Sequence, residues 1–274
     1  MPMTRTLLDP GPSVAGANDN AQETTPAPPS RPAAQGRGGV GRKYERAGRE
    51  VKNGVLYEGR HCAPESESRG CITEKRSVSP LGHGMVFATL LGVQIVRLRF
   101  HHARPSVVLS DGAEGVRSLA AGLPIPVRRI LDLVHVKHRI WEVANAVFGE
   151  RTPECTAWAH TQNDHIEQGR GLAVIDAVRR LRPRAAATQA LADTLATYLT
   201  HHLDRMDDPF YRSLGLRVTT AAVESANYPM TGVRLKGQGM RWVERGAAPM
   251  ATLRTDLCNG EWARRTRQIL DAAA

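Results

Sequence analysis

Two consecutive stretches of the chain each contain a short apolar strand that leads directly into an amphipathic helix. The first, PSVVLSDGAEGVRSLAAGL, begins with a Val/Val/Leu run, continues through Ser110, Asp111 and Gly112, and then has apolar residues at helical spacing. The second passes from VRRILDLV into HVKHRIWEVANAVF, in which apolar residues again recur every three or four positions. This order of strand, helix, strand and helix predicts an α/β fold in which helices connect neighbouring strands of one sheet.

The residues before these two units contain further strand candidates. VKNGVLYEG at 51–59 alternates and ends in glycine, and CITEKRSVS follows at 71–79. VFATLLGVQIV at 86–96 is apolar and partly β-branched, so that it fits either a strand or a buried helix. Residues 1–42 are instead dominated by Pro, Gly, Ala, Ser, Asn and Gln, which bury too little apolar surface to offset the chain entropy. We expect this segment to be disordered and the folded domain to occupy residues 43–274.

The second half of the chain is predicted to be largely helical. Helical periodicity extends over about residues 150–214, which indicates a helical block inserted into the α/β frame. After it, Thr219 or Thr220 is expected to cap a helix that contains Glu224. Two further helices are expected near the carboxyl end, at 247–257 and 261–270.

Several acidic side chains and one imidazole are candidates for chemistry. Asp111 comes directly after a strand, where α/β folds bind ligands, although an Asp there also caps a helix beginning near Ala113. Glu224 lies among small residues that would let its helix approach the sheet closely; the alternative is a solvated surface carboxylate. Asp132 and His135 form a D-x-x-H motif, which fits either a functional signature or a helix cap followed by a partly buried imidazole.

Charge points to nucleic acid as a partner. The 37 Lys and Arg exceed the 27 Asp and Glu, which gives a formal net charge of +10 and attracts polyanions. A stretch with Arg234, Lys236, Arg241 and Trp242 combines cations with an aromatic face, as expected for phosphate contact and base stacking. The alternative is a solvated basic loop in which Trp242 is anchored in the core.

The cysteine content and the hydropathy of the sequence indicate in which cellular compartment the protein is found. The four cysteines are far apart and form no Cys-x-x-Cys pair, so the sequence suggests neither a zinc ribbon nor a secreted disulfide framework. The best apolar run, at 85–98, is short and interrupted by Gln94 and Arg97, and the amino terminus has no secretory signal pattern. We therefore expect reduced thiols, a cytoplasmic protein and no membrane association.

Taken in order, several segments resemble the DDE transposases of bacterial insertion sequences, most closely the Kra-type insertion sequence family. The matching segments are REVKNGVLYEG, VVLSDGAEGVRSL, ILDLVHVKHRIWEVANAVFG, VTTAAVESAN and RLKGQGMRWVERGA, continued by LRTDLCNGEW. Together they span about residues 46–265.

The resemblance implies a ribonuclease H-like catalytic domain with an all-helical insertion before the last catalytic helix. Asp111 and Glu224 match the family's second catalytic Asp and its catalytic Glu, and Asp132 with His135 matches its C/D-x-x-H signature. Two Mg²⁺ or Mn²⁺ ions held by such carboxylates activate a water or a 3′-hydroxyl and stabilise the departing oxygen of a phosphodiester. The implied partners are transposon-end and target DNA, bound by a homodimer. The implied location is the bacterial cytoplasm, in association with the nucleoid.

The amino-terminal region departs from the family pattern. The family's first Asp precedes the REVK-like word, and Asp19 is the best candidate by spacing. The family's amino-terminal DNA-binding region has no counterpart, so we expect a truncated chain. Pro229 and Pro249 fall in stretches that are helical in the family, where Pro removes a hydrogen bond. Two alternatives therefore stay open: a catalytically inactive remnant that only binds DNA, and an unrelated basic nucleic-acid-binding protein.

Overall fold

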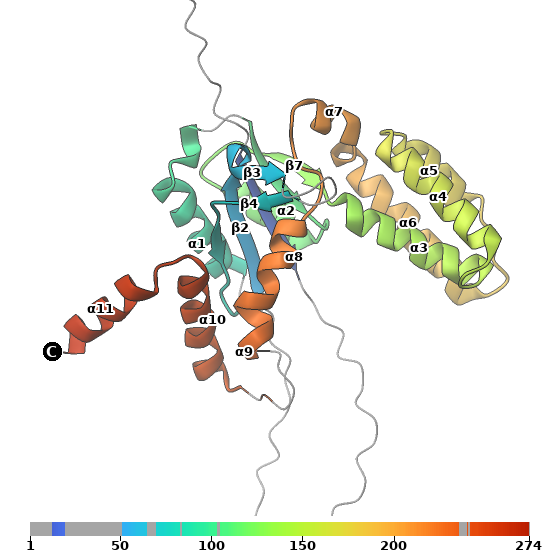
Figure 1. The fold of residues 1–274 in the computed structure, drawn as a ribbon. Coiled ribbons are helices and arrows are strands. Elements are labelled where there is room, and N and C mark those ends of the chain that lie inside the picture. Colours follow the sequence, from blue (N-terminus) through green and yellow to red (C-terminus); the bar gives the residue numbers. More distant parts are fainter. Residues whose placement is uncertain are drawn as a thin grey trace, which may run out of the picture.

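The computed structural model describes residues 13–19, 51–64, 70–82, 84–102, 105–235, 240 and 242–273 (Figure 1). Within them the chain is a mixed α/β protein that is mostly helical and contains a small sheet, as the sequence predicts. The strands are β1 (Ser13–Asp19), β2 (Lys52–Glu58), β3 (Cys62–Pro64), β4 (Gly70–Ile72), β5 (Arg76–Val78), β6 (Ser106–Ser110) and β7 (Arg128–Leu131).

The main sheet has five strands in the order β5-β2-β1-β6-β7. Strand β2 pairs antiparallel with both β1 and β5, whereas β1, β6 and β7 run parallel to one another. The carboxyl ends of these three parallel strands consequently lie along one edge of the sheet. The short strands β3 and β4 pair with each other outside this sheet.

The central strand is a correction to the sequence-based prediction. Residues 1–42 were expected to be disordered, yet Ser13–Asp19 forms β1 in the middle of the sheet. Its Ala- and Gly-rich sequence has weak strand propensity, and the strand exists because β2 and β6 pair with it on both sides. The rest of the predicted segment lies outside the described residues.

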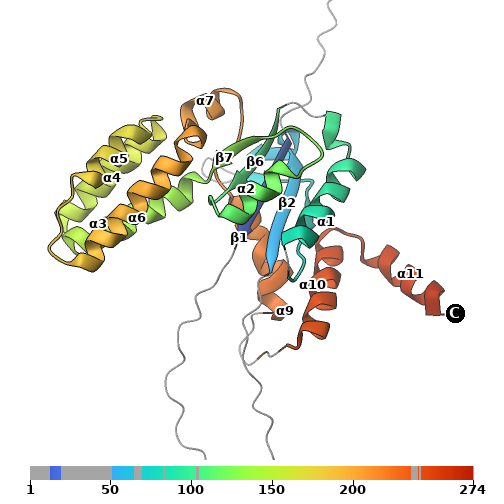
Figure 2. The same cartoon turned by 180° about the vertical axis from the view of Figure 1, so that it is seen from behind.

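Two helices cover one face of the sheet, α1 (Gly84–Arg97) and α2 (Glu114–Ala121) (Figure 2). The ambiguous run at 86–96 is therefore a helix. Its buried residues Phe87, Leu91 and Ile95 recur every four positions and pack in the core on this face of the sheet, together with Leu56 and Val108.

A block of helices extends from the end of β7 and lies beside the sheet (Figure 1). Helical structure over residues 150–214 is thus confirmed, and the helix α3 that leads into the block belongs to it as well. The helices are α3 (Leu133–Phe148), α4 (Pro153–Glu167), α5 (Gly171–Arg179), α6 (Ala186–His202) and α7 (Asp208–Ser213). Their buried side chains are continuous with the core on the second face of the sheet.

The chain then returns to the second face of the sheet through α8 (Ala221–Asn227). A π-helical turn, Tyr228–Gly232, and α9 (Val233–Leu235) continue the helix, and α10 (Glu244–Cys258) and α11 (Trp262–Ala273) follow. Pro229 therefore does not end the helix, because the wider π-helical turn accommodates the missing amide donor. Pro249 lies inside α10. None of the described helices has both the length and the apolar character needed to cross a bilayer.

A buried carboxyl group lies in the helical block. Asp208, in the first turn of α7, is 1% exposed, and among the described residues its Oδ1 has no hydrogen-bond partner. Burial raises the pKa of Asp208 to about 7, while the nearby Arg212 has the opposite effect. The carboxyl group is therefore protonated in the folded chain at pH values where it is ionised in the unfolded chain.

Substituting Asp208→Asn should make stability less dependent on pH. Because the folded-state pKa is raised, the ionisation of Asp208 does not affect stability below pH 4 and destabilises the fold progressively more as the pH rises to about 7. The variant should therefore match the wild type at low pH and exceed it above pH 7, by on the order of 3 kcal/mol. Urea denaturation across this range measures the difference. The exposed Asp164→Asn in α4 is the control, and an equal gain in that variant would contradict the interpretation.

Candidate functional site

Asp111 follows β6 immediately, at the edge of the sheet where the parallel strands end. Its carboxylate Oδ1 accepts a hydrogen bond from the backbone N–H of Ala113, at 3.0 Å, and thereby stabilises the turn before α2. Its backbone carbonyl accepts a hydrogen bond from the hydroxyl of Tyr198 in α6, at 2.7 Å. The loop that carries Asp111 is thus stabilised by a hydrogen bond within the loop and by one from the helical block.

Gly112 allows this loop to approach the helical block closely. Its φ is +89°, in the region that favours glycine. A Cβ at this position would also lie 2.8 Å from Nε2 of His202 and 2.9 Å from Cδ1 of Leu131. Both the backbone conformation and the space therefore require glycine after Asp111.

Asp132, the first residue of the D-x-x-H motif, connects three elements. Its backbone N–H donates to the carbonyl of Ser110, at 2.7 Å, and its Oδ1 accepts from the N–H of Val134, at 3.0 Å, which caps α3. Its Oδ2 accepts a hydrogen bond from the hydroxyl of Thr220, the residue that precedes α8. The side chain is 2% exposed, so this Asp is a buried structural link.

Thr220 occupies the capping position expected for the helix of Glu224, but its hydroxyl is directed to Asp132. No side-chain cap bond forms; instead, its backbone carbonyl accepts from the N–H groups of Val223 and Glu224, at 2.8 and 3.1 Å. Glu224 consequently lies in the first turn of α8, beside the sheet edge that carries Asp111.

Helix α8 contacts the sheet along one side, and the exposed Glu224 lies next to that side, one helical turn before Asn227. Val223 and Ala226 are buried, and Asn227 accepts a hydrogen bond from Nδ2 of Asn53 in β2, at 2.8 Å. Glu224 itself is exposed, and its carboxylate makes no hydrogen bond or ion pair with any residue in the described ranges.

The structure thus brings the elements of Asp111 and Glu224 to one edge of the sheet. Asp19, the expected first catalytic Asp, is the last residue of β1 and is paired in register with Lys52; its side chain lies outside the described part. Within the described part, no three His, Cys, Asp or Glu side chains lie close enough together to hold a metal ion.

A polar cluster behind Asp111 was not predicted from the sequence. Arg139 donates from Nε to Nε2 of His135, at 3.0 Å, and its guanidinium lies 4.3 Å from the centre of the Tyr198 ring. Tyr198 also contacts His202 edge to face, with ring centroids 4.7 Å apart. The D-x-x-H histidine therefore belongs to a network that ends at the carbonyl of Asp111.

The imidazoles of this cluster are neutral at physiological pH. Burial lowers the pKa of His135, and the charge of Arg139 lowers it further, while Asp111 and Asp132 act in the opposite direction. Burial followed by the charge of Arg205 lowers the pKa of His202 to about 4. Because His135 Nε2 accepts a hydrogen bond, the proton of this neutral ring is assigned to Nδ1.

A cleft of about 660 Å³, lined mainly by polar residues, opens beside the cluster. Gly112 lines the cleft on the side of the sheet, Arg139 lines it from α3, and residues of α6 form the rest of its lining. The α6 residues that line it are Asp193, Thr194, Thr197, Tyr198, His201 and His202. Histidine and tyrosine are common in helices, so the sequence alone gave no reason to predict that this side of α6 lines a cleft.

The predicted DNA-contacting residues are only partly described. Arg234 is exposed in α9, and Trp242, just before α10, is 40% exposed. Trp242 is therefore not anchored in the core, which was the alternative for this residue. Lys236 and Arg241 lie outside the described residues.

Comparison with protein-family models, with curated proteins and with solved structures finds no match to this chain.

Replacing Gly112 by Ala should destabilise the fold because it adds a close contact to an unfavourable backbone conformation. Gly215 provides a matched control: its φ is +70°, but nothing lies within 4 Å of a Cβ there. The Gly215→Ala variant should lose about 1 to 2 kcal/mol through backbone conformation alone. Gly112→Ala should lose roughly 1 to 3 kcal/mol more through the contacts with His202 and Leu131. Equal losses, measured by urea denaturation, would show that the loop does not approach the helical block closely.

Proposed function

We propose that the chain is the catalytic region of a DDE-type DNA transposase, which hydrolyses and transfers phosphodiester strands at the ends of an insertion sequence. In this proposal, Asp111 and Glu224 are catalytic residues that bind divalent metal ions. The sequence resemblance to the Kra-type family supplies the activity, and the site geometry supports it.

The observation that carries the proposal is the hydrogen-bonded path between the two acidic residues. It passes from Ser110, beside Asp111, to Asp132, from Asp132 to Thr220, and from the Thr220 carbonyl to the N–H of Glu224. Residues 113 positions apart in sequence are thereby linked through two buried side chains. A basic nucleic-acid-binding protein with fortuitous motif matches has no reason to connect these positions.

The sheet supports a ribonuclease H-like fold as part of this proposal. Such domains have a three-stranded antiparallel unit continued by two parallel strands, with the first strand in the middle. The observed order β5-β2-β1-β6-β7, with β6 and β7 parallel to β1, agrees with that arrangement. The helical block between β7 and α8 corresponds to the expected insertion.

The available side chains suit Mg²⁺ or Mn²⁺, which prefer carboxylate oxygens. Asp111 is fixed by its turn and by Tyr198, whereas Glu224 presents an exposed carboxylate from the first turn of α8. Two bound ions would supply an activated water or 3′-hydroxyl and would stabilise the departing oxygen. The rigid loop and the helix would keep the two carboxylates in fixed directions, and the exposed side of Glu224 would face the DNA.

Charge supports DNA as the substrate. The net charge of +10 attracts the phosphate backbone, and the proposed binding should weaken steeply with salt. Arg234 in α9 and Trp242 just before α10 are exposed, so that they are available to contact phosphates and bases.

A second candidate function, an inactive remnant that only binds DNA, is favoured by the register of β1. Position 18 is paired with Asn53, and position 19 with Lys52. Asn53 contacts α8 through Asn227, so register positions 18 and 53 belong to the α8 face of the sheet.

Asp111 follows Leu109 by two positions, and Leu109 is part of the core on the α8 face. Successive positions of a strand belong to opposite faces, so register position 18, rather than 19, shares the face of Asp111 and α8. The residue at that position is Asn18, an amide in place of a carboxylate. In the remnant, this single difference would weaken metal binding.

A nicking assay on DNA that carries the ends of the encoding element tests both candidates. In the presence of Mn²⁺, the active enzyme should nick its DNA, and Asp111→Ala or Glu224→Ala should slow nicking by at least about 100-fold. Glu142→Ala, on the exposed side of α3, should leave the rate unchanged. DNA binding, followed by fluorescence anisotropy, should be retained in all variants.

The variant Asn18→Asp distinguishes the two candidates in the same assay. If the wild type is an inactive remnant, Asn18→Asp should introduce nicking that is lost again in the Asn18→Asp/Asp111→Ala double variant. Nicking by the wild type that disappears in Asp111→Ala would instead favour the active enzyme. If neither protein nicks DNA, or if Asp111→Ala has no effect, the proposed catalytic role is wrong.

A further inference from the structure

Helix α1 is apolar on two sides, although only one side faces the sheet. Phe87, Leu91 and Ile95 are at most 3% exposed and pack in the core. Large apolar side chains on its outer side are between 42% and 71% exposed, namely Met85, Val86, Leu90, Val93 and Val96. Helices that are apolar all round are normally covered by other parts of a protein. Because these outer side chains of α1 are exposed, the described chain does not cover them.

The outer side of α1 borders an apolar groove of about 1,280 Å³, which we call the α1 groove. Met85, Val93 and Val96 form one wall, and Leu119 and Pro124, at the end of α2 and just after it, contribute to the other. Lys52 and Arg97 also line the groove. A groove of this volume and composition suits the apolar side of a helix.

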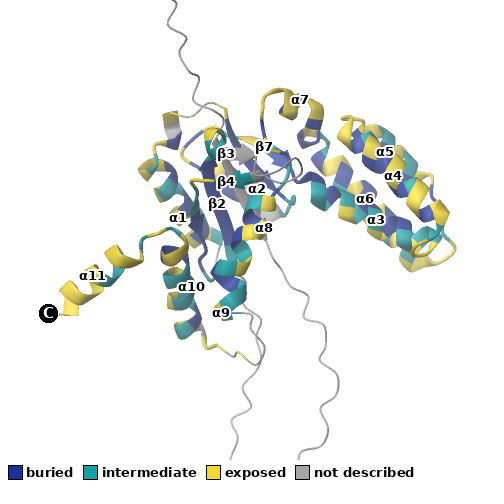
Figure 3. Ribbon diagram, viewed as in Figure 1, coloured by how far each residue is buried: buried dark blue, intermediate teal, exposed yellow. Residues whose placement is uncertain are grey.

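The same chain carries a helix with an unpartnered apolar side. Helix α11 has no buried residue, and it projects away from the body of the molecule (Figures 1 and 3). Trp262, Ile269 and Leu270 lie on one side of it and are 46%, 54% and 64% exposed. Arg267 and Asp271 lie on the opposite side.

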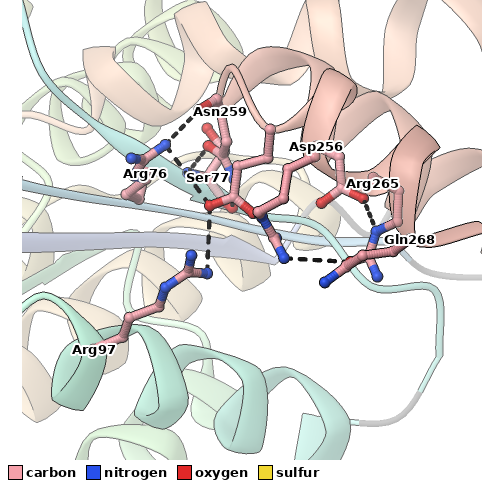
Figure 4. A network of polar contacts seen from close by, with 9 residues as sticks. Arg76, Ser77, Arg97, Asp256, Asn259, Arg265 and Gln268 are labelled. Atoms are coloured by element: carbon pink, nitrogen blue, oxygen red, sulfur yellow. Dashed lines mark hydrogen bonds and ion pairs between the residues drawn. The ribbon is translucent and has the colours of Figure 1, made fainter. Parts of the chain in front are cut away.

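The start of α11 is held firmly by the turn between α10 and α11 (Figure 4). Asn259 forms two hydrogen bonds with the backbone of Ser77 in the edge strand β5, at 2.7 and 2.9 Å. Arg265 donates to Asp256, at 2.7 Å, and Glu261 pairs with Arg97 at the end of α1, at 3.3 Å. These contacts fix the direction of α11 away from the body and keep it from folding back onto its own α1.

We propose that α11 of one copy of the chain lies in the α1 groove of a second copy, and that the reciprocal contact forms a twofold dimer. The lengths match, because α11 with 12 residues and α1 with 14 residues span about 18 and 21 Å. Each contact would cover six partly exposed apolar side chains, three from the groove and three from α11, on the order of 600 Å² in total. Two contacts give about 1,200 Å², which is at the lower end of the range for a stable interface. The proposal is independent of the catalytic activity.

Sedimentation velocity of the full chain tests the dimer. The wild type should be a dimer at micromolar concentration, and Val93→Lys in the groove should raise the dissociation constant at least about 100-fold. The double variant Ile269→Lys/Leu270→Lys in α11 should do the same. Asp271→Lys, on the opposite side of α11, is the matched control and should remain dimeric. Since all these residues are exposed, circular dichroism should show unchanged folding.

Disulfide crosslinking identifies which surfaces meet. In a Cys258→Ser background, which removes the exposed native thiol, chains with Val93→Cys should crosslink to chains with Ile269→Cys in a mixture. Neither chain should crosslink when it is alone. A monomeric wild type overturns the proposal. So does crosslinking of Val93→Cys chains to one another, which would indicate that two α1 helices pack together instead.

Discussion

The candidate site depends on the hydrogen bonds that the carboxylate of Asp132 accepts. This carboxylate is buried just after β7, caps α3 and accepts a hydrogen bond from the hydroxyl of Thr220, while the backbone N–H of Asp132 donates to the carbonyl of Ser110. A buried carboxylate is costly unless donors surround it, and here both oxygens have one. The segments that carry Asp111 and Glu224 are therefore connected through one residue that itself has no access to substrate.

The helical block contributes a second support to the same place. Tyr198 of α6 holds the carbonyl of Asp111, and Arg139 of α3 joins Tyr198 to His135. The two polar residues of the D-x-x-H motif thus support the candidate site indirectly. Asp132 links it to α8, and His135 belongs to the polar cluster that contacts the Asp111 loop. Since the block leaves the sheet directly after Asp132 and returns just before Thr220, its packing and the arrangement of the two acidic residues depend on each other.

Local patterns predicted most elements, and tertiary contacts decided the rest. The strand and turn around Asp111 and the helices of the inserted block follow from apolar spacing and were correctly located. The small residues of β1 carry no such pattern, because that strand depends on neighbours on both sides. Likewise, the spacing of Asp132 and His135 indicated a motif, but the partners Thr220, Arg139 and Tyr198 come from distant segments. Pro229 was misleading because the sequence does not reveal that a helix can widen around it.

The central claim is that the carboxylates of Asp111 and Glu224 converge on the same divalent metal ions, and iron-mediated self-cleavage tests it most directly. Fe²⁺ bound in place of Mg²⁺ is oxidised to Fe³⁺ by added H₂O₂, which yields hydroxide and a hydroxyl radical that cuts the backbone near the bound metal. The account predicts two cleavage sites in the folded wild-type chain, one beside residue 111 and one beside residue 224, both lost in Asp111→Ala. Cleavage beside only one of these residues, or two sites that respond independently to Asp111→Ala and Glu224→Ala, would contradict it.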